Sequence, residues 1–110
     1  MEAAVNRANV LIELGRLETA EAYAAMLNAG LVPVVLEHGS LGCSGDLAPL
    51  AHCALALTGE GPVSDRDGRR TDAAAALREA GLKPVELREK EGLALINGTD
   101  GMLGMLVLAI

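Results

Sequence analysis

Residues 39–52 read GSLGCSGDLAPLAH, a glycine-rich loop that runs directly into an apolar segment. Asp46 is a favourable N-cap residue, Pro49 lies in the first turn where proline is tolerated, and Gly59 offers a stop. The stretch therefore predicts a loop followed by a helix over residues 47–58. Backbone N–H groups at the start of such a helix carry partial positive charge and often hold an anion.

On both sides of this loop, hydrophobic periodicity and helix-stop signals predict further short elements. Upstream, we expect helices at residues 3–14 and 19–28, with Thr19 as N-cap and Gly30 as stop, and a short extended segment at 31–36. Downstream, we expect a hairpin turn at 65–70, an Ala-rich helix at 71–80 ending at Gly81, an extended return at 83–87, a helix at 90–96 and an apolar terminal helix.

The composition favours a small, mainly α-helical fold. Hydrophobic residues make up 51% of the 110 residues and charged residues 22%, which allows one domain with a core. Tyr23 is the single aromatic residue, and a core of Ala and Leu is typical of packed helices. We expect residues 61–88 to form a small exposed hairpin and helix excursion within the single domain of residues 1–110.

The charges and the two cysteines exclude several function classes. The net charge is −6, and no Lys or Arg occurs between Arg16 and Arg66, which argues against nucleic-acid binding. Two cysteines are too few to indicate a fold held together by disulfide bonds. The first ten residues do not resemble a secretion signal, so we expect a cytoplasmic protein. The apolar stretch 93–110 is interrupted by polar residues and glycines, which makes a membrane span a poor interpretation. We interpret it as a core helix that is cut short, and the chain as a fragment.

Three kinds of chemistry can be considered for the loop from its residues alone. Phosphate binding is disfavoured because there is no GK[ST] or GxGxxG motif and no nearby cation. A nucleophile, Ser44 or Cys43 with His38 or His52 as base, is disfavoured because the G-x-S-x-G spacing is not met. A metal site using these histidines and cysteines is disfavoured because His52 and Cys53 are adjacent and diverge by about 100° on a helix.

A fourth interpretation is a family resemblance that accounts for the whole stretch. The motif GSLGCSGDLAPLAH, the GEG at residues 59–61 and the KEGLALINGT at residues 90–99 together resemble the aromatic amino acid lyase family, and within it the members that act on histidine. The resemblance implies a segment of a helical-bundle lyase. It also implies that Cys43-Ser44-Gly45 cyclises by itself to the electrophile 4-methylidene-imidazol-5-one (MIO).

The chemistry of this cyclisation explains the residue types in the motif. The Gly45 nitrogen attacks the Cys43 carbonyl, which requires a tightly folded backbone that a Cβ at position 45 would hinder. Ser44 supplies a β-hydroxyl that leaves as water, whereas Cys43 contributes only backbone and replaces the commoner alanine. The resemblance further implies that Asp46 assists the cyclisation and that Asn97, in INGT, contacts the ring and the substrate carboxylate.

The resemblance also implies the reaction, the assembly and the partners. The expected reaction is the non-oxidative elimination of ammonia from L-histidine to give trans-urocanate, with no metal or external cofactor, by a full-length homotetramer. The expected partner is a small amino acid, without nucleic acid or membrane. Phenylalanine or tyrosine ammonia-lyases and aminomutases share the motif, and a catalytically inactive, truncated helical fragment is the alternative from another class.

Overall fold

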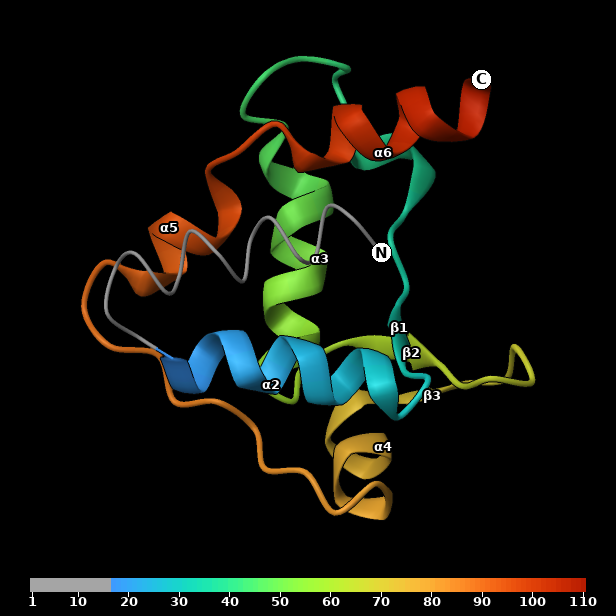
Figure 1. The fold of residues 1–110 in the computed structure, drawn as a ribbon, viewed down its shortest axis with the longest axis vertical. Helices are drawn as coiled ribbons and strands as arrows, with labels where there is room; N and C mark the ends of the chain where they lie inside the picture. Colours follow the sequence, from blue (N-terminus) through green and yellow to red (C-terminus); the bar gives the residue numbers. More distant parts are fainter. Residues whose placement is uncertain (1–16) are drawn as a thin grey trace.

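The computed structural model describes residues 17–110, so the helix expected at residues 3–14 lies outside the described residues. Helix α3 (Leu47–Leu57) stands at the centre of the fold. Helix α2 (Leu17–Asn28) crosses near its C-terminal end, and helix α6 (Asp100–Ala109) crosses above its N-terminal end (Figure 1). Helix α5 (Glu91–Ile96) packs beside α3. The mainly helical fold expected from the composition is confirmed.

A small antiparallel sheet lies beyond the C-terminal half of α3. Strands β2 (Pro62–Ser64) and β3 (Arg70–Asp72) form the hairpin that the sequence predicts around its Asp-Gly turn. Strand β1 (Val32–Pro33) pairs with the other edge of β2, so the strand order is β1-β2-β3. The hairpin is therefore the continuation of a sheet that begins upstream of α3.

The C-terminal end of α3 is fixed by a glycine cap, as the sequence predicts. Gly59 has a left-handed backbone (φ +83°), which allows the Glu60 N–H to donate back to the Leu55 carbonyl at 2.8 Å. Helices α2 and α4 (Ala73–Glu79) also end just before the predicted stops at Gly30 and Gly81. The cap fixes where the chain leaves α3 and enters the sheet.

The core joins α2, α4 and α5 to α3. Its buried residues come from α2, α3, β2, α4 and α5 and include Tyr23, Met26, Leu57, Val63, Leu77 and Leu95. Leucine and alanine supply most of this cluster, as the composition indicates. Burial of apolar surface around α3 therefore holds in place the helix whose N-terminus carries the glycine-rich loop.

Two local expectations were wrong. Thr19 is not an N-cap, because it lies inside α2 and is fully buried. The helix expected at 71–80 begins only at Ala73, because the residues before it pair with β2. The segment 83–87, expected to be extended, lies outside the helices and the sheet, and its Val85 N–H donates to the Leu57 carbonyl at 3.0 Å.

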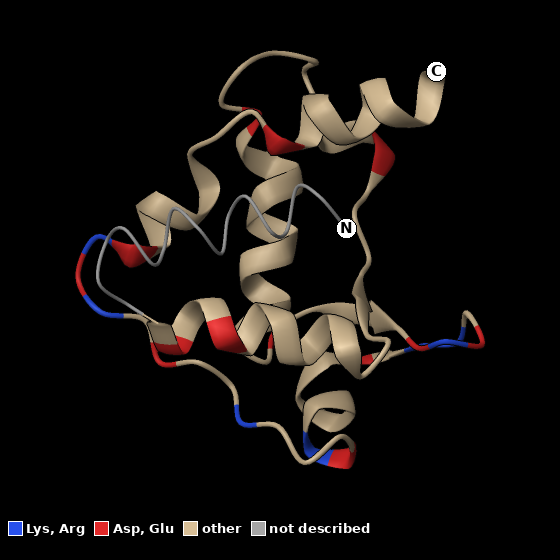
Figure 2. Cartoon of the chain, viewed as in Figure 1, with Lys and Arg blue, Asp and Glu red and all other residues tan. Residues whose placement is uncertain are grey.

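The apolar C-terminal stretch is divided into two helices. By length and composition, Glu91–Ala109 reaches the size of a membrane-spanning helix. The turn at residues 97–99 breaks it into α5 with 6 residues and α6 with 10 residues, and each alone is too short to span a bilayer. Charged side chains gather around α2, α4 and the outer loops, whereas α3 and most of α6 are uncharged (Figure 2).

Candidate functional site

The tripeptide Cys43-Ser44-Gly45 forms the outer part of the loop that enters α3. Cys43 and Ser44 are exposed, and Gly45 is half-buried. The loop leaves a short 3-10 helix (Glu37–Gly39) and reaches over the N-terminal end of α3 (Figure 1). The residues that the family resemblance singled out are therefore on the surface of the described chain, at a helix N-terminus.

Asp46 anchors the inner end of this loop. Its side chain is buried, with the residue 3% exposed, and both carboxylate oxygens accept hydrogen bonds. The Ser40 hydroxyl donates to Oδ2 and the Leu41 N–H donates to Oδ1 at 2.9 Å. These bonds, Ser40 first, lower the pKa of Asp46 below its ordinary value of 3.8, although burial opposes the shift. Asp46 is therefore an ionised anchor at neutral pH.

The expected N-cap role of Asp46 is only half right. Asp46 occupies the N-cap position of α3, yet its side chain makes no capping hydrogen bond to the helix. The reason is competition, because both carboxylate oxygens face donors of the preceding loop. The aspartate thus organises the loop, and the first N–H groups of α3 do not bind its carboxylate.

A second anchor joins the loop to the INGT motif. The Gly45 N–H donates to the Gly98 carbonyl at 3.1 Å. Gly45 has a left-handed backbone (φ +73°), and a Cβ at this position would meet no atom within 4 Å. The conformation therefore favours glycine because of its backbone angle, whereas the space around it is open.

Asn97 is brought to the site by this contact. It is exposed and extended at the end of α5, directly before Gly98. The two sequence motifs, which are far apart in the chain, thus meet at the N-terminal end of α3.

The electrostatics of the site come from the backbone of α3. The helix has 11 residues, and the aligned peptide dipoles give its N-terminus about half a positive charge. The sequence has no Lys or Arg between Arg16 and Arg66, so no cationic side chain of that stretch lies beside the loop. The arrangement can therefore stabilise negative charge that develops on a group held at the loop.

The structure does not support the metal and histidine alternatives. Among residues 17–110, no group of three or more His, Cys, Asp or Glu side chains could hold a metal ion. His38 is exposed and lies 3.3 Å from the Glu37 carboxylate. His52 and Cys53 are both half-buried on α3.

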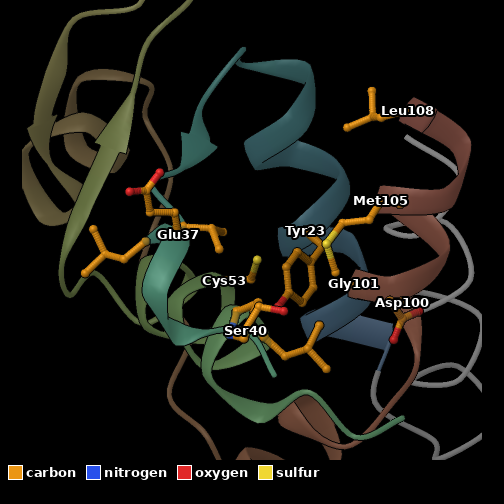
Figure 3. Close-up of a pocket in the computed structure, with 13 residues that line it drawn as sticks. Tyr23, Glu37, Ser40, Cys53, Asp100, Gly101, Met105 and Leu108 are labelled. Atoms are coloured by element: carbon orange, nitrogen blue, oxygen red, sulfur yellow. The ribbon is translucent and has the colours of Figure 1, made fainter. Parts of the chain in front are cut away.

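An apolar cleft of about 560 Å³ lies between α2, α3, α6 and the segment before the loop. The side chains of Tyr23, Cys53 and Met105 line it, together with those of Ser40 and Asp100 (Figure 3). No sequence pattern indicates this cleft, because its walls come from four separate segments.

Sequence reasoning also missed Ser40 and the Gly98 carbonyl. The Ser40 hydroxyl accepts from the Gly42 N–H at 3.2 Å, a two-residue spacing that is common for serine in turns and could have been expected. Its bond to Asp46 spans six residues, and the Gly45–Gly98 bond joins distant segments. Neither contact has a local sequence pattern.

Comparison with known proteins gives a consistent result over nearly the whole chain. The sequence model of the family described as "Aromatic amino acid lyase" matches residues 5–110. A histidine ammonia-lyase of Streptomyces avermitilis is 65% identical over 95 residues, which are 86% of this chain and 19% of that protein. An MIO-dependent tyrosine 2,3-aminomutase of Streptomyces globisporus is 59% identical over 85 residues, which are 77% of this chain and 16% of that protein.

The fold is likewise similar to a solved structure. The crystal structure of histidine ammonia-lyase from Trypanosoma cruzi superposes with a TM-score of 0.79 and 42% sequence identity. The match covers 97% of this chain and 22% of that one. The chain therefore spans between 16% and 22% of the length of these relatives.

Proposed function

Because the chain belongs to the aromatic amino acid lyase family, we propose that it is the loop-bearing part of a histidine ammonia-lyase. The reaction is the elimination of ammonia from L-histidine to give trans-urocanate. The 65% identity to the Streptomyces avermitilis enzyme supports histidine as substrate. The observation that carries the proposal is the double anchoring of the loop, by Ser40 and Leu41 to Asp46 and by Gly45 to Gly98.

The proposal includes the self-formed MIO group, built from Cys43, Ser44 and Gly45. The residues fit it, because the tripeptide lies at the outer part of the loop and Gly45 already has the left-handed turn. The 59% identity to a relative named as MIO-dependent gives further support. When formed, the group supplies an electrophile for the substrate amine, and no metal or external cofactor is needed.

The other residues of the site hold the loop in place and orient the substrate. The ionised Asp46 fixes the inner end of the loop, and this is how we propose that it assists cyclisation. The amide of Asn97 donates to the substrate carboxylate, a role supported by its position beside Gly98. The N-terminus of α3 stabilises negative charge at the loop.

We propose that the natural protein works in the cytoplasm as a homotetramer. Support comes from the exposed apolar residues of α6, which a longer chain or a neighbouring subunit would cover. These residues are Leu103, Met105, Leu106, Val107 and Leu108.

A second candidate function is that of a tyrosine aminomutase, which the Streptomyces globisporus relative favours. The deciding experiment offers L-histidine, L-phenylalanine and L-tyrosine separately to the full natural polypeptide, beside its Ser44→Ala variant. Urocanate and ammonia from histidine, absent in the variant, are the expected result. A β-amino acid from tyrosine without urocanate would favour the aminomutase, and no product from a folded protein would contradict both.

A further inference from the structure

Ser40 lies at the start of the loop that carries the tripeptide, and its side chain bonds to the residue at the end of that loop. Its hydroxyl donates to Asp46 Oδ2 and accepts from the Gly42 N–H at 3.2 Å. The other carboxylate oxygen of Asp46 accepts from the Leu41 N–H at 2.9 Å. Ser40 and Asp46 thus tie together the two ends of the segment 41–45.

The chemistry of ring closure makes this tie more important than the second anchor. A bond forms between the Gly45 nitrogen and the Cys43 carbonyl carbon, and the carbonyl oxygen leaves as water with the amide protons of Gly45 and Ser44. A second water takes the Ser44 hydroxyl and the hydrogen on its Cα. Atoms balance without an oxidant or reductant. Because Gly45 loses its proton, its hydrogen bond to the Gly98 carbonyl ends in the same step.

The tie between Ser40 and Asp46 involves none of the atoms that are lost. It therefore persists while the loop contracts and the Gly98 contact disappears. A hydrogen bond to a carboxylate is stronger than one between neutral groups, and the burial of Asp46 limits replacement of the hydroxyl by water. Because this bond fixes both ends of the segment 41–45, it also reduces the conformational entropy that is lost when the ring closes.

We propose that Ser40 is a positioning residue for the ring closure of Cys43-Ser44-Gly45, which it aids by holding Asp46 at the loop base. The inference rests on the proposed function, because it presumes that the tripeptide cyclises. Ser40 contacts neither the substrate nor the reacting atoms in this role. Its contribution is to the rate at which the ring forms.

The experiment follows the mass of the newly synthesised natural polypeptide over time and measures the fraction that has lost two waters. Ser40→Ala is expected to slow this loss by about tenfold, since one charge-assisted hydrogen bond is removed. Ser40→Thr keeps the hydroxyl and should restore the rate. Ser64→Ala, the same exchange in strand β2, should leave the rate unchanged.

The outcomes separate the two proposals. A wild-type protein that never loses two waters would overturn the proposed function itself. A wild type that cyclises while Ser40→Ala cyclises equally fast would overturn the role of Ser40 alone. If Ser40→Ala does not fold, the isosteric pair Ser40→Thr and Ser40→Val decides, because only threonine keeps the hydroxyl. Equal rates for that pair would also overturn the inference.

Discussion

Two loops of this chain, 40–46 and 65–69, each depend on an aspartate that accepts hydrogen bonds from its own loop, but they differ in how the loop is joined to the rest of the fold. In the hairpin turn, Asp65 Oδ1 accepts from the Asp67 and Arg69 N–H groups, each at 2.9 Å. Its Oδ2 accepts from the Arg69 guanidinium at 3.1 Å. All the partners of Asp65 lie within four residues, and the turn contacts α2 through one side chain, because the Arg66 guanidinium donates to the Asn28 carbonyl at 2.7 Å.

The loop 40–46 needs the rest of the fold. Asp46 holds Ser40 and Leu41, and Gly45 reaches across to Gly98 at the end of α5. Its outer residues are exposed above the N-terminus of α3. An aspartate thus closes each of these two loops locally, whereas loop 40–46 is also held by a backbone hydrogen bond to a distant segment, from Gly45 to Gly98. Equivalent changes in the two loops should therefore have different consequences.

The largest effect is expected from serine exchanges. Ser44→Ala removes the β-hydroxyl that must leave as water, so the electrophile cannot form. Because enzymes accelerate reactions by about 10⁶-fold or more, turnover should fall by at least about 10³-fold. Urocanate formation by the full natural polypeptide measures this effect.

Two controls belong to this prediction. Ser64→Ala in the hairpin and Cys43→Ala in the tripeptide should both retain turnover, since neither removes a reacting side chain. Loss of activity in Ser64→Ala would show that the hairpin shares the function of the loop.

A glycine pair gives the next largest effect. Gly45 (φ +73°) and Gly68 (φ +76°) are both left-handed, and a Cβ at either position meets no atom within 4 Å. Alanine at each should therefore reduce the free energy of unfolding by a similar amount, about 1–2 kcal/mol. Chemical denaturation measures the shared effect on stability.

The rate of cyclisation should differ between the Gly45→Ala and Gly68→Ala variants. Gly45→Ala slows the loss of two waters, because alanine disfavours the left-handed backbone (φ +73°) that the Gly45 nitrogen has in the tripeptide, whereas Gly68→Ala lies outside the tripeptide and does not. Equal cyclisation in both variants would refute the special role of position 45.

The aspartates predict a pH dependence. Hydrogen bonds, from Ser40 foremost in one loop and from the Arg69 N–H in the other, lower the pKa values of Asp46 and Asp65 below 3.8. A lowered pKa in the folded state adds stability above the unfolded value, and this stability is lost as the pH falls through the folded value.

Unfolding free energies measured from about pH 7 to about pH 3 should therefore fall in the wild type. Asp46→Asn and Asp65→Asn should each flatten the curve, because each removes a carboxyl group whose pKa is lowered in the folded state. A steeper curve in either variant would contradict the assignment.

The smallest effect is expected at Arg69. Its guanidinium is 79% exposed at the Asp65 carboxylate, and exposed ion pairs contribute about 0–1 kcal/mol. Arg69→Ala should reduce stability by no more than this amount, and about 1 M salt should abolish the difference. A larger effect that persists in salt would mean that Arg69 contributes more to the hairpin turn than an exposed ion pair.

The helices of this fold were predictable because their signals are local. Gly30, Gly59 and Gly81 mark three helix ends correctly, and the helix after Asp46 is where the sequence predicts it. The pairing of β1 with β2 was missed, because two-residue strands are too short to show a periodic pattern. The start of α4 was predicted at residue 71, two residues too early. Residues 71 and 72 belong to the short strand β3, and their pairing with β2 outweighs helix propensity.

The candidate site was predictable in its residue types but only partly in its geometry. The tripeptide and Asn97 stand out through the family motifs, and the Gly45–Gly98 bond brings the two motifs together. The hydrogen bond from Ser40 to the Asp46 carboxylate could not be predicted from the sequence. An aspartate directly before a helix is normally expected to cap the helix with its side chain. Only the path of the loop decides which donors reach the carboxylate.

The most direct test of the account is the mass of the peptide that contains residues 40–46, isolated from the full natural polypeptide. The account predicts that this peptide is lighter than its sequence by two waters, with the loss located in Cys43-Ser44-Gly45 and absent in Ser44→Ala. A folded protein whose peptide has the unmodified mass would contradict the central claim that this loop is built to cyclise.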